Sequence, residues 1–153
     1  MGKYIFNNHA LLDTKEGVLK SGFQVLVEGN RIVEVKKGQI NSPDAETIDL
    51  GGRTLMPGLI DCHAHVFIAQ FTDNQSVLPS EMTARSSTYL REMILRGFTT
   101  IRDAGGADYG HKMSVERGYF EGPRMFVSGR ILSQTGGHGD HRGKADFCSC
   151  ANA

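Results

Sequence analysis

The order of predicted elements after Arg53 constrains the fold more than any other feature of this sequence. Three apolar or β-branched runs are typical of short strands, and they lie at residues 62–66, 98–103 and 124–128. Segments with helical spacing separate them, at residues 81–95 and 108–120. Strands joined through helices pair in parallel with right-handed crossovers. The sequence therefore predicts an α/β unit on parallel strands, with the mostly apolar run at 62–66 as a buried strand.

The first of these helices should present one apolar face to the sheet. Its apolar side chains recur at helical spacing, and they are Met82, Tyr89, Leu90, Met93 and Ile94. Ser80 offers a side-chain cap at the start of the helix, and Gly97 follows the last turn.

The part of the chain before Arg53 has a different pattern and predicts strands and turns only. Residues 23–28 and 31–35 alternate in hydropathy around Gly29-Asn30, which is typical of a hairpin. Residues 4–6 and 47–50 are shorter strand candidates. We expect a small all-β piece that needs a partner surface to be stable.

Composition narrows the class of protein. Lysine plus arginine equals aspartate plus glutamate at 17 each, so net charge gives no electrostatic case for nucleic-acid binding. No apolar run approaches the ~18 residues of a membrane span, and no signal-peptide core follows Met1. Three cysteines cannot all pair with one another, which fits a reducing compartment. We expect a cytoplasmic protein with no nucleic-acid or membrane partner.

The segment Asp61-Cys62-His63-Ala64-His65 carries the strongest chemical signal. Residues i and i+2 of a strand share a face, with Cα atoms about 6–7 Å apart. His63 and His65 can therefore offer two imidazoles to one Zn²⁺. Two ligands do not complete a zinc site, so for this pair taken alone the favoured interpretation is one packed and one solvated histidine.

The wider stretch at residues 55–66, Leu-Met-Pro-Gly-Leu-Ile-Asp-Cys-His-Ala-His-Val, closely resembles the strand-1 signature of the amidohydrolase superfamily. Other segments resemble the same family. Residues 27–32 are similar to its small N-terminal β-sandwich, and residues 97–103 to its second barrel strand. Residues 122–130 and 135–139 resemble the third strand and its loop, most closely in the branch with imidazolonepropionase-like proteins and Xaa-Pro and Xaa-Arg dipeptidases (prolidase-type).

The resemblance implies an architecture and a length. Residues 1–54 would be the β-sandwich portion, and residues 55–153 the first three β/α units of a (β/α)8 TIM barrel, truncated. Such a barrel needs about 200 residues or more, and this chain has 153. We therefore expect an N-terminal fragment.

The resemblance also implies a metal centre. His63 and His65 would bind one or two divalent ions, zinc being expected. The family's other ligands, a strand-4 lysine, histidines of strands 5 and 6 and a strand-8 aspartate that acts as the proton shuttle, would lie beyond the chain. Lys144 has no strand around it and is not assigned. The catalytic acid or base is thus unassigned, and we expect this chain alone to be inactive.

The implied activity of the full-length parent is hydrolysis of a C–N bond, peptide or amide, by a zinc-activated water. The substrate would be a dipeptide or other small molecule, most like that of an Xaa-Pro or Xaa-Arg dipeptidase, and a homo-oligomer is left open. In the glycine-rich loop at residues 136–141, His138 and His141 are candidate substrate contacts. Imidazolonepropionase-like hydrolysis of a cyclic amide is one alternative. A non-catalytic metal- or partner-binding module is another.

Two carboxylates and two thiols are the remaining candidates for functional side chains. Asp61 is expected to orient a histidine or cap local backbone. Asp103 is expected either at the rim of the site or in a buried pair or loop cap. Cys148 and Cys150 have no second cysteine pair and are interpreted as ordinary thiols.

Overall fold

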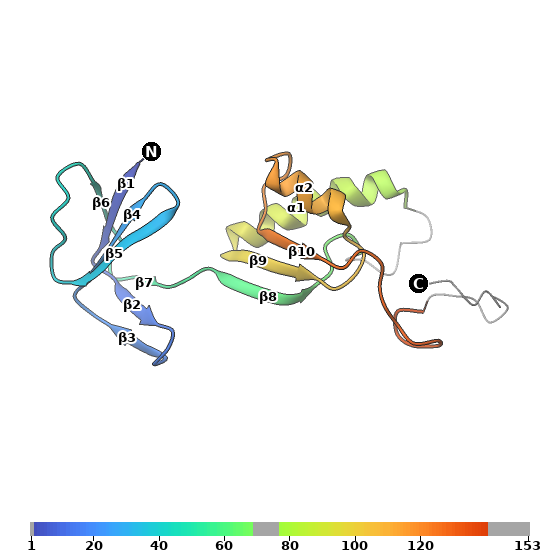
Figure 1. The fold of residues 1–153 in the computed structure, drawn as a ribbon, viewed down its shortest axis with the longest axis horizontal. Helices are drawn as coiled ribbons and strands as arrows, with labels where there is room; N and C mark the ends of the chain where they lie inside the picture. Colours follow the sequence, from blue (N-terminus) through green and yellow to red (C-terminus); the bar gives the residue numbers. More distant parts are fainter. Residues whose placement is uncertain (1, 69–76, 141–153) are drawn as a thin grey trace. The chain divides into compact units, whose positions relative to one another are not determined.

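The computed structural model describes residues 2–68 and 77–140, and the chain divides into two compact units, Met1–Pro57 and Gly58–Ala153 (Figure 1). The described part of the first unit contains strands and no helix, whereas the second combines strands and helices. Among the described residues, no helix has both the length and the apolar character needed to span a membrane.

A four-stranded sheet forms the larger half of the first unit. Its strands, in spatial order, are β5 (Arg31–Lys37), β4 (Phe23–Glu28), β1 (Lys3–Asn7) and β6 (Glu46–Asp49). β4 is antiparallel to both β1 and β5, and β1 is parallel to β6. The predicted hairpin is confirmed, with Gly29 at a φ of 59° in its turn, a conformation that glycine adopts without strain.

The resemblance implied a β-sandwich, but the strands of the second sheet were not located from the sequence. This sheet orders β3 (Val18–Lys20), β2 (Ala10–Asp13) and β7 (Thr54–Leu55), with β2 antiparallel to β3 and parallel to β7. Each strand has only two to four residues, which is too short for a period of two to stand out. The unit buries Ile5, Leu26 and Ile40 together as its core.

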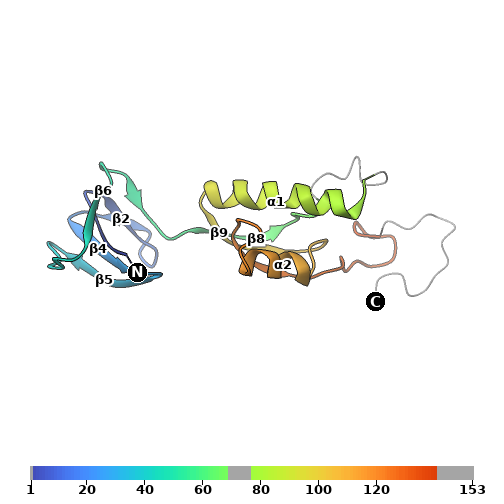
Figure 2. The same cartoon turned by 90° about the horizontal axis from the view of Figure 1, so that it is seen from above.

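The second unit confirms the predicted parallel strands. β8 (Leu59–Ala64), β9 (Phe98–Asp103) and β10 (Arg124–Val127) pair in parallel in chain order. Helix α1 (Pro79–Leu95) lies between β8 and β9 in the chain, and α2 (Tyr109–Glu116) between β9 and β10. Because successive crossovers of one hand move the same way across a sheet, both helices lie on the same face (Figures 1 and 2).

The core of this unit lies between the helices and the sheet. Its buried members are Val66, Leu90, Ile101, Ala107 and Met125. The predicted apolar face of α1 is confirmed in Leu90, which is fully buried, and in Met93, which packs against the cluster. The helix begins differently from the prediction. Pro79 starts it and Leu78 is at the cap without a side-chain hydrogen bond, since a proline at the first helical position needs no N–H partner and has its φ preset.

The expectation of a buried first strand was wrong. Ile60 is 65% exposed, and Leu59, Cys62 and His63 are exposed as well. The reason is the position of β8 at the edge of the described sheet, where one long side has no neighbouring strand and one face is not covered by the described helices.

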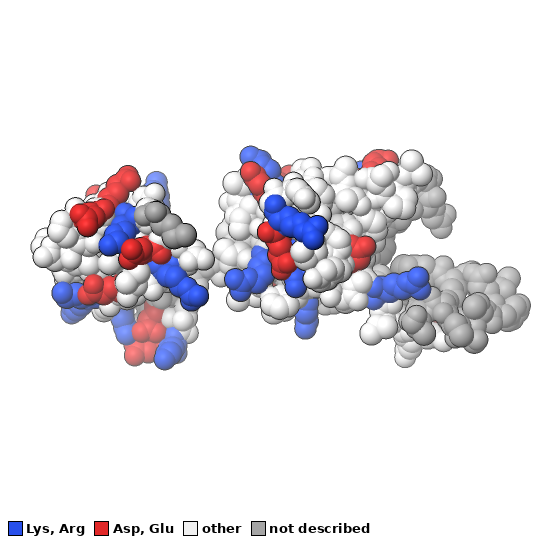
Figure 3. All heavy atoms as spheres, turned by 45° about the horizontal axis from the view of Figure 1, so that its top comes forward, with Lys and Arg blue, Asp and Glu red and all other residues white. Residues whose placement is uncertain are grey.

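Charged side chains of both signs are interspersed on the face of each unit seen in Figure 3. Exposed ion pairs among the described residues include Arg91 with Glu121 at 3.1 Å and Arg96 with Glu92 at 2.9 Å. Exposed pairs of this kind contribute little to stability.

Candidate metal and substrate site

Two histidines lie together at the carboxyl end of β8. His63 belongs to the strand and His65 follows it directly, and their ring centroids are 5.2 Å apart at an interplanar angle of 73°. Both line a cleft of about 180 Å³. The cleft is also lined by Ala104 after β9 and by residues 131–133, 138 and 139 after β10. Strand ends and loops that are distant in sequence therefore meet at this histidine pair.

One hydrogen bond sets the tautomer of the neutral His65 ring. Its Nδ1 lies 2.9 Å from the carbonyl oxygen of Gly105. A carbonyl oxygen only accepts hydrogen bonds, so Nδ1 carries the proton and donates it. In the neutral ring Nε2 then keeps its lone pair, which is the form of imidazole that binds a metal.

The backbone beside His63 is held by two side chains. Asp61 Oδ1 accepts a hydrogen bond from the His63 N–H at 2.9 Å, and Arg102 Nε donates to the Cys62 carbonyl oxygen at 2.7 Å. Of the two roles expected for Asp61, the structure thus shows the capping of local backbone.

Asp103, the last residue of β9, is fully buried. Its carboxylate accepts backbone N–H bonds from Val66 at 2.8 Å, Gly105 at 3.0 Å and Ala107 at 3.2 Å. Of the roles left open for it by the sequence, this arrangement is that of a loop cap. The bonds from Gly105 and Ala107 are local, two and four residues along the chain, whereas no local pattern signals the bond from Val66, which lies 37 positions away after a different strand.

The loop after β10 brings His138 to the same cleft as His63 and His65. The loop is held internally by Gly136 N–H donating to Asp140 Oδ2 at 2.8 Å and Gly139 N–H donating to Ser133 Oγ at 3.2 Å. Ile131, Leu132 and Ser133 also line the cleft, and the sequence reasoning did not single them out. These three residues line the cleft because of the path that the chain takes after β10, and no motif in the sequence specifies that path.

Other candidates lie outside the described residues, among them His141, Lys144, Cys148 and Cys150. Within residues 2–68 and 77–140 no group of three or more His, Cys, Asp or Glu side chains has the arrangement of a metal site. The two imidazoles fit two of the three or four protein ligands of a zinc ion. In His65 the proton lies on Nδ1, where it is donated to the Gly105 carbonyl oxygen, so Nε2 keeps the lone pair that a metal needs.

Comparison with known families decides the classification. Residues 54–148, well over half of the chain, match the sequence profile of the amidohydrolase family. The chain belongs to the amidohydrolase family. The resemblance noted in the sequence is thereby confirmed.

Solved structures of amidohydrolases match almost the whole chain. One, described as an amidohydrolase, is 46% identical with a TM-score of 0.86, and the match covers 98% of this chain and 38% of that one. A prolidase in complex with N-methylphosphonate-L-proline is 42% identical with a TM-score of 0.86, and the match covers 97% of this chain and 37% of the prolidase. An Xaa-Pro dipeptidase with methionine in its active site is 28% identical with a TM-score of 0.81, and the match covers 97% of this chain and 39% of the dipeptidase.

Curated amidohydrolase relatives match shorter segments. Ochratoxinase of Aspergillus niger is 35% identical over 91 residues, which are 56% of this chain and 19% of that protein. A dihydroorotase of Syntrophotalea carbinolica is 42% identical over 64 residues, 42% of this chain and 15% of that enzyme. The chain thus spans about a fifth of the length of the first of these relatives and under two fifths of the solved structures.

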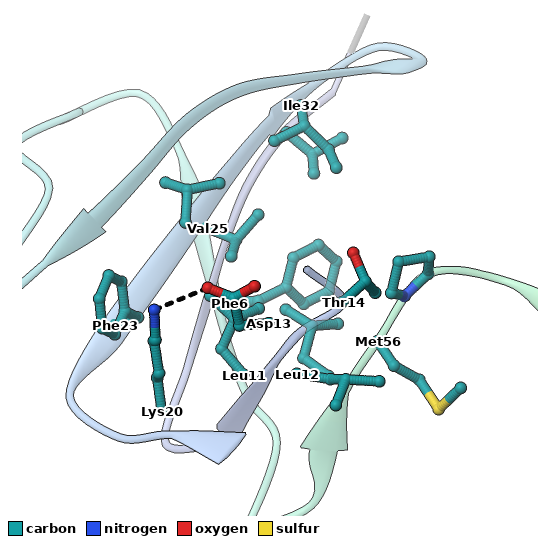
Figure 4. A pocket seen from close by; sticks show the side chains of 14 residues that line it. Phe6, Leu11, Leu12, Asp13, Thr14, Lys20, Phe23, Val25, Ile32 and Met56 are labelled. Atoms are coloured by element: carbon teal, nitrogen blue, oxygen red, sulfur yellow. Dashed lines mark hydrogen bonds and ion pairs between the residues drawn. The ribbon is translucent and has the colours of Figure 1, made fainter. Parts of the chain in front are cut away.

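A larger cleft of about 440 Å³ lies in the first unit of this amidohydrolase chain (Figure 4). Its described lining is mostly apolar and includes Phe6, Leu12 and Val25. Lys20 Nζ donates to Asp13 Oδ2 at 2.6 Å, and this bond is the main cause that lowers the pKa of Asp13 and raises that of Lys20. A paired lysine and carboxylate among apolar side chains does not resemble a hydrolytic centre, so the histidine cleft is the candidate site.

Proposed function

We propose that this chain is the N-terminal part of a zinc-dependent hydrolase that cleaves the C–N bond of Xaa-Pro or Xaa-Arg dipeptides. The observation that carries the proposal is the pair His63 and His65, side by side in a cleft at the carboxyl end of β8, with Nε2 of His65 available as a ligand. Active sites of barrel enzymes lie at that end of the strands.

The barrel is part of the same proposal. Three parallel strands follow one another in chain order, with both described helices on one face, as they would in the first units of a (β/α)8 barrel. The similarity to solved amidohydrolases over 97–98% of this chain supports the continuation into strands that this sequence does not contain.

The chemistry is divided between the ion and the chain. A divalent ion bound at His63 and His65 would supply Lewis-acid activation of a water and of the scissile carbonyl. The Gly105 carbonyl keeps the His65 proton on Nδ1, and so keeps Nε2 unprotonated. His138, across the cleft, would donate a hydrogen bond to the substrate's carboxylate or carbonyl oxygen, and His141 is proposed to assist it. The remaining ligands and the proton shuttle would come from outside this chain, so the 153 residues alone should not turn over substrate.

The dipeptide specificity draws support from the solved relatives. A proline-containing phosphonate occupies the prolidase that is 42% identical to this chain, and methionine occupies the Xaa-Pro dipeptidase. The matches to both proteins cover 97% of this chain.

Hydrolysis of a cyclic amide is the second candidate. The dihydroorotase match and an imidazolonepropionase of Rhizobium rhizogenes, 44% identical over 50 residues, favour it. These matches cover only 42% and 33% of this chain, against 97% for the prolidase, so the dipeptidase is the better supported activity.

Native mass spectrometry of the protein as its source makes it is the first test, because one spectrum reports chain mass and bound metal. The proposal predicts a mass well above 16.7 kDa with one or two zinc ions. A chain of 16.7 kDa without metal would instead support a non-catalytic module. The zinc-loaded protein is then offered Xaa-Pro and Xaa-Arg dipeptides, with release of the C-terminal amino acid as the readout. Imidazolonepropionate and dihydroorotate are offered beside them, with chromatography of the ring-opened product as the readout, because opening a ring releases no second molecule.

Variants of neighbouring residues assign the site. In the full-length protein, His63→Asn should abolish dipeptide hydrolysis and lose zinc. Cys62→Ser, on the same strand but not among the described lining of the cleft, should retain both. Unchanged turnover in His63→Asn would remove His63 from the site, and hydrolysis of the cyclic amides alone would replace the dipeptidase with the second candidate.

A further inference from the structure

Asp103 connects the ends of two strands around His65. Its Oδ2 accepts the N–H of Val66, the residue directly after His65, while its Oδ1 accepts the N–H groups of Gly105 and Ala107. The same Gly105 accepts the Nδ1–H of His65 on its carbonyl oxygen. One buried carboxylate therefore anchors both the backbone that carries His65 and the residue that holds its ring.

Gly105 has little freedom to move away from this arrangement. Its neighbours are held by backbone bonds, Ala104 N–H to the Ala64 carbonyl at 2.9 Å and Gly106 N–H to the Gly129 carbonyl at 2.7 Å. A Cβ on Gly105 would clash with the Ile131 side chain and lie 3.2 Å from the Ile131 Cα. Ile131 therefore packs directly on the Gly105 backbone. The Gly105 N–H itself donates to Asp103 Oδ1 at 3.0 Å.

We infer that Asp103 is a positioning residue for the zinc ligand His65, acting through Val66 and Gly105 to keep the imidazole in its Nδ1–H form. This inference rests on the proposed function only for the role of the metal. The hydrogen bonds that carry it belong to the protein without metal.

A carboxylate suits this position for a chemical reason. It is an acceptor on both oxygens, and three N–H donors converge on it. In Asp103→Asn one oxygen becomes an NH₂ group, which then faces either the N–H of Val66 or those of Gly105 and Ala107. In either orientation the NH₂ group faces a backbone N–H, so two hydrogen-bond donors meet in a fully buried place. The side chain then loses its hydrogen bond either to Val66, which follows His65, or to Gly105, which holds the His65 ring.

The test is carried out by NMR on the full-length protein with ¹⁵N-labelled histidine rings, at a pH where histidine is neutral. Ring ¹⁵N shifts give the tautomer of each histidine, and titration with ZnCl₂ gives the affinity. Wild type should show His65 as the Nδ1–H tautomer. Asp103→Asn should lower that population and weaken zinc binding by about tenfold or more, the low end of what is lost when a partner behind a metal ligand is removed.

Asp108→Asn is the matched control. Asp108 also accepts a backbone N–H and contacts an imidazole, that of His111, at 3.2 Å and 2.8 Å, but it does not line the histidine cleft. Asparagine caps helices about as well as aspartate, so this variant should keep the wild-type His65 tautomer and zinc affinity.

The outcomes separate this inference from the proposed function. A folded Asp103→Asn chain with the wild-type His65 tautomer overturns the positioning role, whatever its zinc affinity. If wild type shows no zinc-dependent shifts at His63 and His65 while Asp103→Asn alters the tautomer, the positioning role stands and the metal site fails. If Asp103→Asn does not fold, the His65 tautomer of the wild-type protein is the deciding measurement. An Nε2–H tautomer there contradicts the inference, and an Nδ1–H tautomer agrees with it.

Discussion

Truncation of Leu90 to alanine tests the packing that supports the histidine strand. Leu90 is fully buried in α1 and packs in the cluster with Ile101 and Met125. Leu→Ala removes three carbons, which are worth about 2.4 kcal/mol at roughly 0.8 kcal/mol each. The backbone opposite is close, because a Cβ on Gly122 would lie 2.8 Å from the Cβ of Leu90. Tight surroundings resist collapse, so a cavity term should raise the loss to about 3–4 kcal/mol of unfolding free energy.

The measurement is urea unfolding followed by circular dichroism at 222 nm, a wavelength dominated by helix. All described helices lie in the second unit, so the signal reports that unit. Leu95→Ala is the matched control, on the same helix but 68% exposed, and it should change the free energy by no more than about 0.5 kcal/mol.

Two results are informative in opposite directions. A midpoint for Leu90→Ala far below that of Leu95→Ala, or loss of the helical signal without urea, agrees with a specific core between α1 and the sheet. Equal midpoints for the two variants would refute the reasoning, because they would mean that α1 is not packed on β9 and β10 as described.

Two further predictions concern carboxylates with shifted pKa values. Asp108→Ala removes the N-cap of α2 and should cost about 1 kcal/mol of unfolding free energy at neutral pH. The hydrogen bond from the His111 ring is the main cause that lowers the pKa of Asp108. The ionised Asp108 carboxylate therefore contributes to the free energy of unfolding above pH about 4, and this contribution is lost as the pH falls through the folded-state pKa of Asp108. The gap between wild type and variant in urea unfolding should therefore narrow in acid, and a constant gap would contradict this origin. Lys20→Met should raise the pKa of Asp13 toward its ordinary value in a ¹³C carboxyl titration, while Lys112→Met should leave it unchanged. A pKa of Asp13 that does not move would exclude Lys20 as the cause.

Much of the second unit follows from its sequence because the information is local. The β-branched run at Phe98–Asp103 and the helical spacing around Leu90 each depend on near neighbours in the chain, and the structure has both elements. Glycine and proline supply the boundaries, as with Gly97 at a φ of 91° after α1. The pattern in β8 was misleading, because an apolar strand has the same sequence whether a neighbour covers it or not.

The site divides in the same way. The spacing of His63 and His65 predicts that both lie on one face, which needs only the period of two of an extended chain. In the structure β8 ends at Ala64 and His65 follows it, and the two ring centroids lie 5.2 Å apart. Whether His138 reaches the same cleft, and which nitrogen of His65 is protonated, depends on contacts with the loops after β9 and β10. The roles of Asp103 and Gly105 belong to this second class. Their bonds to the segment after β8 join residues about 40 positions apart, so parallel pairing of the strands has to bring them together first.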